Sequence, residues 1–326
     1  MRKLLLGTTA LAAATAMSAS ALADVSIAGS YEFKYKSESS QVAAKDGTTM
    51  SHGDTDMVFT FTNKTDSGLT LAYRYDVTDM TADGGAMTGD ENSLSISGGF
   101  GKIVLGQDDD ASDSYNIDEM DLPTEEPGST FASASIGSSS SVGTTDDMKV
   151  AYHLPAMGGL TAGISFADSG TNTGTDKTAM GVRYSMEAGG AAITLGYANT
   201  KKEATTKDTD ETNMGLKVVS GDLSLIVSQG TYEGVDEDRD NQGASISYNM
   251  GNGMTLAAYT FKSEDALDAG EELSKSGLEV AYTIASGLTA VVNVEDYDYK
   301  VGTGHESGDT VDDNGSITQL TLKAAF

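Results

Sequence analysis

The sequence predicts an all-β fold class, a transmembrane antiparallel β-barrel of 16 strands. Three observations support this prediction. Apolar and polar residues alternate with a period of two along most of the chain, the connections alternate between short and long, and the last segment alternates up to an aromatic C-terminal residue. A strand points successive side chains to opposite faces, so this period gives each strand one apolar and one polar face. Membrane barrels carry this weak alternating signal in place of long apolar runs.

The first 23 residues are predicted to be a cleaved signal for export. Arg2 and Lys3 precede an apolar run, which ends in small residues up to Ala23. The run is too short to span a membrane comfortably, and the remaining chain contains no stretch of about 18 apolar residues. Residues 24–326 are therefore expected to form one exported barrel domain that no helix anchors.

Sixteen segments share the alternation, and the first of them shows it most clearly. Tyr31 and Phe33 lie on one face of this segment, whereas Glu32 and Lys34 lie on the other. The predicted strands are 25–36, 55–64, 69–78, 92–99, 102–108, 147–155, 160–168, 178–186, 191–200, 212–219, 223–232, 242–250, 254–263, 275–285, 288–299 and 316–326.

The connections between these strands are of two kinds. Seven are short and contain Gly, which permits the positive φ that a tight hairpin requires. Eight are long and polar, at 37–54, 79–91, 109–146, 169–177, 201–211, 233–241, 264–274 and 300–315. This sorting and an even strand count are typical of a closed membrane barrel, because lipid requires every backbone polar group to be paired. A large soluble β-sandwich is the alternative, but its loops would not sort by side.

The composition excludes several other classes of protein. The absence of Cys excludes disulfide frameworks and cysteine–zinc sites. With 49 acidic and 20 basic residues, the net charge of -29 would repel phosphate, so no nucleic-acid partner is expected. Tyrosines near strand ends are expected to form the interfacial belts of a barrel, although Tyr favours strands in any protein. These are Tyr31, Tyr35, Tyr75, Tyr184, Tyr232, Tyr248, Tyr297 and Tyr299.

The C-terminal segment and two turns carry a family resemblance. Leu320 and Leu322 alternate with polar residues before the terminal Phe326. A Thr-Asp-Ser-Gly-Leu turn begins at Thr65, and a Gly-Phe-Gly-Lys-Ile hairpin begins at Gly99. Together with the strand count, these features resemble the Gram-negative outer-membrane porins, in particular the general porins of alphaproteobacteria.

This resemblance implies a passive diffusion channel for ions and small hydrophilic solutes in the outer membrane of a Gram-negative bacterium. It also implies a homotrimer, contact with lipid and lipopolysaccharide, and recognition of Phe326 by the barrel-assembly machinery. No cofactor is required. An outer-membrane enzyme is one alternative, but His52, His153 and His305 belong to no recognisable catalytic constellation. A structural or adhesive barrel is the other.

The longest predicted loop is also the most acidic. No Lys, Arg or His lies between Ile103 and Met148. Loops of this length are usually functional or disordered. In the resembled family, the third long loop folds into the barrel and narrows it, so this loop is expected to be the pore constriction. A solvated acidic surface loop is the alternative. The expected constriction acids are Asp108, Asp109, Asp110, Asp113, Asp118, Glu119, Asp121, Glu125 and Glu126.

Four basic residues are expected on the pore wall. Lys34, Arg74, Lys149 and Arg183 have the polar parity of their strands. A charge that faces lipid near the midplane costs about 2–4 kcal/mol, so these side chains should face the lumen. The resemblance implies that such a basic cluster faces the acidic loop, and the alternative is a set of solubilising lumen residues. An excess of carboxylates favours cations, so a weak cation preference is expected.

Acidic residues of the other long loops are candidate ligands for Ca²⁺ or Mg²⁺, because hard cations take oxygen ligands. No strict ligand spacing accompanies them. The candidates are Asp208, Asp210, Asp236, Glu237 and Asp238.

Overall fold

The fold was analysed in a computed structural model of the chain. The structure describes residues 24–53, 55–78, 88–125, 127, 147–168, 176–203, 207–235, 237–267, 270–302 and 311–326. The predicted export signal, residues 1–23, lies outside the described residues, as do Glu126, Asp236 and His305.

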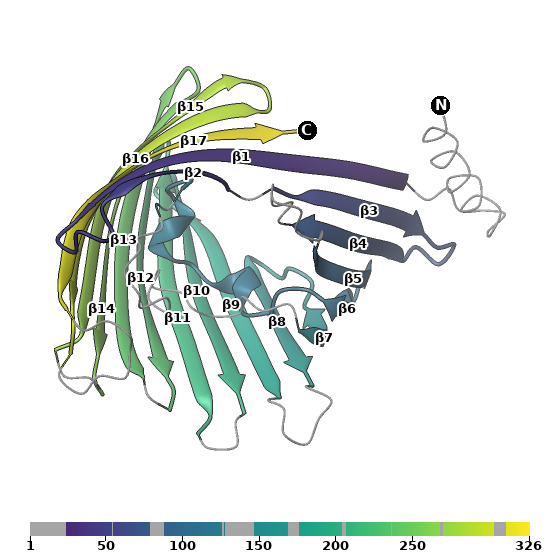
Figure 1. The fold of residues 1–326 in the computed structure, drawn as a ribbon. Helices are drawn as coiled ribbons and strands as arrows, with labels where there is room; N and C mark the ends of the chain where they lie inside the picture. The colour runs from purple at the N-terminus through teal and green to yellow at the C-terminus, as the bar shows by residue number, and fades with distance from the viewer. Residues whose placement is uncertain are drawn as a thin grey trace.

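The described residues form one antiparallel sheet that closes on itself (Figure 1). From β3 to β17 each strand pairs with the next one in sequence, β1 pairs with both β2 and β3, and β17 pairs with β1 to complete the ring. The strands are β1 (Asp24–Ser40), β2 (Gly47–His52), β3 (Met57–Lys64), β4 (Thr70–Thr78), β5 (Thr88–Gly98), β6 (Gly101–Gln107), β7 (Met148–His153), β8 (Leu160–Ala167), β9 (Lys177–Ala188), β10 (Ala191–Lys202), β11 (Thr209–Ser220), β12 (Leu223–Glu233), β13 (Asp238–Gly251), β14 (Met254–Asp265), β15 (Glu272–Ala285), β16 (Leu288–Lys300) and β17 (Asp313–Ala325).

These strands occupy sixteen positions in the ring, because β2 and β3 share one. β3 pairs with the Asp24–Gly29 half of β1, and β2 pairs with the Phe33–Glu38 half. The prediction of a closed 16-stranded antiparallel barrel is therefore confirmed. Closure removes the sheet edges that would otherwise leave backbone groups unpaired in lipid.

The two faces of the wall differ in chemistry as the alternation predicts. On β15, Leu278 is 66% exposed and Val280 is also exposed, whereas Glu279 and Ala281 between and beside them are buried. Exposed large apolar residues recur at alternate positions around the ring. An apolar surface of this extent is unusual for a soluble monomer and suits a hydrocarbon environment. Among the described residues, no helix has the length and apolar character to cross a bilayer.

The strands extend further into the long connections than the sequence predicts. The expected loop 37–54 contains β2, and the expected loop 233–241 shortens to residues 234–237. These extensions consist of polar residues such as Thr48 and Thr49, so they lack the apolar face used to recognise strands. Strand segments beyond the lipid layer need no apolar face, since water is present on both sides.

The expected tyrosine belt is wrong for three residues. One of them, Tyr232, has the inward parity of Ile226 and Ser228 on β12. Tyr31, Tyr75, Tyr184 and Tyr248 are exposed on the outer face, as predicted. Tyr297 and Tyr299 instead face inward and are buried in a small apolar cluster inside the barrel. They share the inward parity of Asn293 and Glu295 on β16, and the prediction used closeness to the strand end without this parity. The other cluster members are Phe261, Leu273 and Ile317.

Candidate pore constriction

The described part of the acidic connection runs along the inward face of the wall. Figure 1 shows this segment, with its short helical turns η1 (Asp113–Tyr115) and η2 (Glu119–Asp121), within the ring of strands. Its polar groups bind wall side chains strand after strand. The amide of Ala111 donates to Ser165 Oγ on β8 (2.9 Å), Ser112 Oγ lies 2.7 Å from Thr200 Oγ1 on β10, and the amide of Ile117 donates to Asn213 Oδ1 on β11 (3.1 Å).

The first anchor of the loop is a buried ion pair. The Asp110 carboxylate lies 3.0 Å from Lys149 Nζ on β7 and 2.9 Å from Lys177 Nζ on β9. Lys149 also donates to the backbone carbonyl of Asp108. Asp110 and Lys149 are almost completely buried, so this pair holds the start of the loop and leaves little charge facing the pore water.

The middle of the loop also binds the wall. Arg183 on β9 donates to the carbonyl of Asn116. Glu119 is fully buried and accepts a hydrogen bond from Ser228 Oγ on β12 (3.0 Å). Tyr115 Oη lies 2.9 Å from His153 Nδ1.

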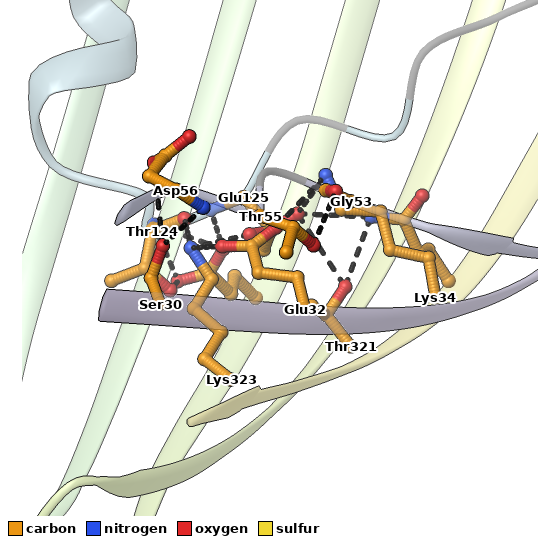
Figure 2. Close-up of polar contacts among 12 residues, drawn as sticks. Ser30, Glu32, Lys34, Gly53, Thr55, Asp56, Thr124, Glu125, Thr321 and Lys323 are labelled. Atoms are coloured by element: carbon orange, nitrogen blue, oxygen red, sulfur yellow. Dashed lines mark hydrogen bonds and ion pairs between the residues drawn. The ribbon is translucent and has the colours of Figure 1, made fainter. Parts of the chain in front are cut away.

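The far end of the loop is held by the group of contacts in Figure 2. The buried Glu125 carboxylate lies 3.2 Å from Lys34 Nζ on β1 and pairs with Lys323 on β17. Gln319 Nε2 (3.2 Å) and Thr321 Oγ1 (3.4 Å) also donate to it. Because a charge-assisted hydrogen bond is stronger than a neutral one, this cluster fixes the loop to β1 and β17.

Two neighbouring strands complete the far anchor. The Glu279 carboxylate on β15 accepts from the amides of Thr124 (2.8 Å) and Glu125 (2.9 Å) and from Thr124 Oγ1 (2.9 Å). Asn293 Nδ2 on β16 donates to the Glu125 carbonyl (2.8 Å). The segment 108–125 therefore reaches from the β7–β9 wall to β15, β16, β17 and β1.

The structure divides the predicted constriction acids into two groups. Asp110, Glu119 and Glu125 are buried against the wall. Asp108, Asp109, Asp113 and Asp118 are partly exposed, and Asp121 is exposed. Asp118 caps η2 by accepting from the Met120 amide.

The partly exposed acids have altered titration. Burial raises the pKa of Asp109 to about 6, and the neighbouring Asp113 and Asp108 carboxylates add to the shift. Burial also raises the pKa of Asp113 and of Asp121, against the opposing charge of Arg183. The charge of Asp109 is therefore expected to change near pH 6, so the total charge of the loop depends on pH in this range.

Three of the four predicted wall cations contact the loop, namely Lys34, Lys149 and Arg183. Arg74 pairs with Asp76 (2.6 Å) and Glu91, which also lie on the wall. Its strand, β4, is the third of the sixteen positions, and β12, which binds Glu119, is the eleventh. Arg74 therefore lies across the barrel from the middle of the loop.

Several wall residues that hold the loop were missed by the sequence analysis. Glu279 and Lys323 have the polar parity of their predicted strands, so the rule applied to the four predicted cations would also have selected them. Lys177 was missed because the prediction placed it in the loop 169–177, whereas β9 begins at this residue. Asn293 and Gln319 share this parity, but uncharged inward residues are too common for parity alone to mark them.

The candidate metal ligands are not assembled in the described part of the chain. Among the described residues, no three His, Asp or Glu side chains form a group that could hold a metal ion. Asp210 accepts from Asn199 Nδ2 (2.6 Å), and Glu237 pairs with Arg239 (3.1 Å).

Comparisons with known proteins agree with this architecture. Residues 7–302 match the family model described as Gram-negative porin. No curated protein sequence matches the chain.

Three solved structures illustrate the likeness of fold. The anion-selective porin of Comamonas acidovorans is 17% identical, with 94% of this chain and 100% of that chain covered and a TM-score of 0.72. The outer-membrane protein OmpT of Vibrio cholerae, in its trimer form, is 15% identical, with 93% and 99% covered and a TM-score of 0.70. A mutant of the Rh. blastica porin is 17% identical, with 93% and 100% covered and a TM-score of 0.66.

Proposed function

The chain belongs to the family of Gram-negative porins, and from this premise we propose that residues 108–125 are the constriction of a weakly cation-selective pore. As a porin, the protein is a passive diffusion channel of the outer membrane. Sixteen strands leave an aqueous interior, whereas a barrel of eight is filled by side chains. The observation that carries the proposal is the path of the loop, which is bound to the wall from Asp110 on one side to Glu125 on another.

The selectivity follows from which acids the wall neutralises. Lys149 and Lys177 offset Asp110, and Lys34 and Lys323 offset Glu125. Asp109, Asp113 and Asp121 take no part in these ion pairs, and they lie on a segment without any basic residue. Carboxylates that line a narrow passage raise the local concentration of cations and lower that of anions.

A planar bilayer measurement tests this proposal. The triple variant Asp109→Asn, Asp113→Asn, Asp121→Asn should shift the reversal potential in a KCl gradient toward that of a non-selective pore. A matched control neutralises three exposed acids at the short turns, Asp66→Asn, Glu187→Gln and Asp222→Asn. An equal shift in both triple variants, or no shift in either, would contradict the assignment of selectivity to the loop.

We also propose a homotrimer that contacts lipid and lipopolysaccharide, with Phe326 recognised by the barrel-assembly machinery. Support comes from the family and from the exposed apolar outer wall, on which Phe326 is 84% exposed. Cross-linking of the purified protein in detergent should trap three copies, and a monomer would contradict the proposal. Passive diffusion requires no catalysis, so hydrolysis of lipid or peptide by the purified protein would favour the enzymatic alternative.

Binding of Ca²⁺ or Mg²⁺ at the other acidic loops remains a prediction, for which each cation alone is the probe. A lower denaturation temperature after chelation would support it. An unchanged temperature would weigh against it.

A further inference from the structure

The loop rests on a row of small residues that crosses six strands of the inner wall. Gly163 on β8 is paired directly with Gly181 on β9. One step along the strands, Gly196 on β10 is paired with Gly215 on β11, Gly215 with Ser228 on β12, and Ser228 with Gly243 on β13. We name these five glycines the glycine row: Gly163, Gly181, Gly196, Gly215 and Gly243.

Three alternate loop residues fill the space above this row. Tyr115, Ile117 and Glu119 are buried, whereas Asn116 and Asp118 between them are partly exposed. An extended chain advances roughly 6–7 Å in two residues, somewhat more than the ~4.8 Å between neighbouring strands. The segment therefore crosses the strands with every second side chain directed at the wall.

A side chain at any position of the glycine row would collide with the loop. A Cβ on Gly181 would lie 2.6 Å from Tyr115 Cβ, and a Cβ on Gly196 would lie 2.8 Å from the Tyr115 carbonyl oxygen. A Cβ on Gly163 would lie 2.8 Å from the Tyr115 ring. Ordinary carbon contacts need about 3.5–4.0 Å, so the loop must move by roughly 1 Å to accept a methyl group.

The same conflict continues further along the row. A Cβ on Gly215 would collide with the backbone carbonyl of Ile117, and one on Gly243 would collide with the Glu119 carboxylate. Backbone atoms cannot rotate away as a flexible side chain can. Gly215 therefore tests the position of the loop most directly.

Backbone conformation does not require these glycines. None of the five has a positive φ, unlike the turn glycines Gly68 (84°) and Gly221 (59°), around which a Cβ would meet nothing within 4 Å. A glycine inside a strand costs about 0.5–1 kcal/mol relative to alanine, so its presence there calls for another cause. Close approach of the loop backbone supplies that cause.

We propose that the glycine row is a seat that holds the constriction loop flush against the wall and thereby sets the width of the pore. The inference rests on the proposed function, because it takes the loop as the constriction. Lengthening any wall side chain in the row displaces the loop toward the lumen and narrows the passage.

Single-channel conductance of the full-length protein in planar bilayers tests the seat. The variants Gly181→Ala and Gly215→Ala should each lower the conductance below that of the wild type, because the displaced loop narrows the passage. The largest polyethylene glycol that enters the pore should also be smaller for these variants than for the wild type. The control Gly29→Ala changes a strand glycine whose Cβ would have no neighbour nearer than 3.5 Å.

Folding of each variant is verified by the usual shift in gel mobility between unheated and heated barrel. A folded Gly215→Ala variant with unchanged or increased conductance would overturn the proposal that the glycine row sets the position of the loop. If the wild-type protein itself formed no channel, the proposed function would fail instead, so the two failures are distinguishable. If Gly215→Ala does not fold, Gly181→Ala decides the question by the same readout.

Discussion

The replacement Glu125→Ala removes the centre of the far anchor, and its cost can be worked out from the contacts. Glu125 accepts from four groups, on Lys34, Lys323, Gln319 and Thr321. Breaking a fully buried ion pair costs about 3–5 kcal/mol. The two lysines are 22% and 31% exposed, and both also pair with Glu32, at 3.3 and 3.1 Å. Their charges therefore stay compensated, and the loss should be about 2–3 kcal/mol.

This loss applies to docking of the loop end and leaves the barrel closed. Because 1.4 kcal/mol corresponds to a factor of ten, the undocked state should become roughly 30- to 150-fold more populated. Hydrogen exchange measured by mass spectrometry reads this directly, since the amides of Thr124 and Glu125 are bonded to Glu279 in the docked state. Their exchange should accelerate by the same factor, while the Ala111 amide at the other anchor should keep its rate.

A control with the same chemistry separates docking from loss of charge. Glu264→Ala removes a carboxylate that is paired with Lys262 but is 57% exposed, so it should leave exchange in the loop unchanged. If Glu125→Ala folded and its loop exchanged at the wild-type rate, the reasoning about the far anchor would be refuted.

Two further predictions concern pH and assembly. The cation preference should decline as the pH falls through about 6, because Asp109 is ionised above its raised pKa and neutral below it. Reversal potentials recorded from pH 8 to 5 measure this decline, and the variant Asp109→Asn should lack it. Phe326→Ala should lower the yield of assembled barrel in cells and leave refolding in detergent unchanged. The Phe326 ring is exposed, and the backbone pairing of this residue with Gly29 does not depend on the side chain. Equal losses in both assays would mean that Phe326 contributes to stability and not to recognition.

The barrel could be predicted because its signal is local. The alternation of Tyr31 and Phe33 with Glu32 and Lys34 is visible within a few residues, and a one-residue error would turn charges toward lipid. The limits of the strands were less predictable. The β2 strand, Gly-Thr-Thr-Met-Ser-His, has one large apolar residue, Met50, so no alternation marks it.

The roles within the loop could not be read from the sequence, because its path depends on distant residues. Asp110 and Asp121 lie in the same acidic run, yet one is buried between two lysines and the other is exposed. Lys177 follows Asp110 by more than sixty positions, and Lys323 follows Glu125 by nearly two hundred. Only closure of the ring brings β17 beside β1, and with it Lys323 beside Lys34 at one carboxylate.

The division of the loop acids separates two properties that one acidic run could otherwise confuse. Position depends on Asp110, Glu119 and Glu125, whose carboxylates are buried against the wall, and lysines there offset the charges of Asp110 and Glu125. The field depends on Asp109, Asp113 and Asp121, whose loss would leave every described contact to wall side chains in place. Anchor variants should therefore change conductance and its fluctuations more than the reversal potential, and lumen variants should do the reverse. If anchor variants and lumen variants changed conductance and reversal potential to the same extent, the loop acids would not divide into these two roles. Recording both quantities for each variant in the same bilayer experiments tests the division.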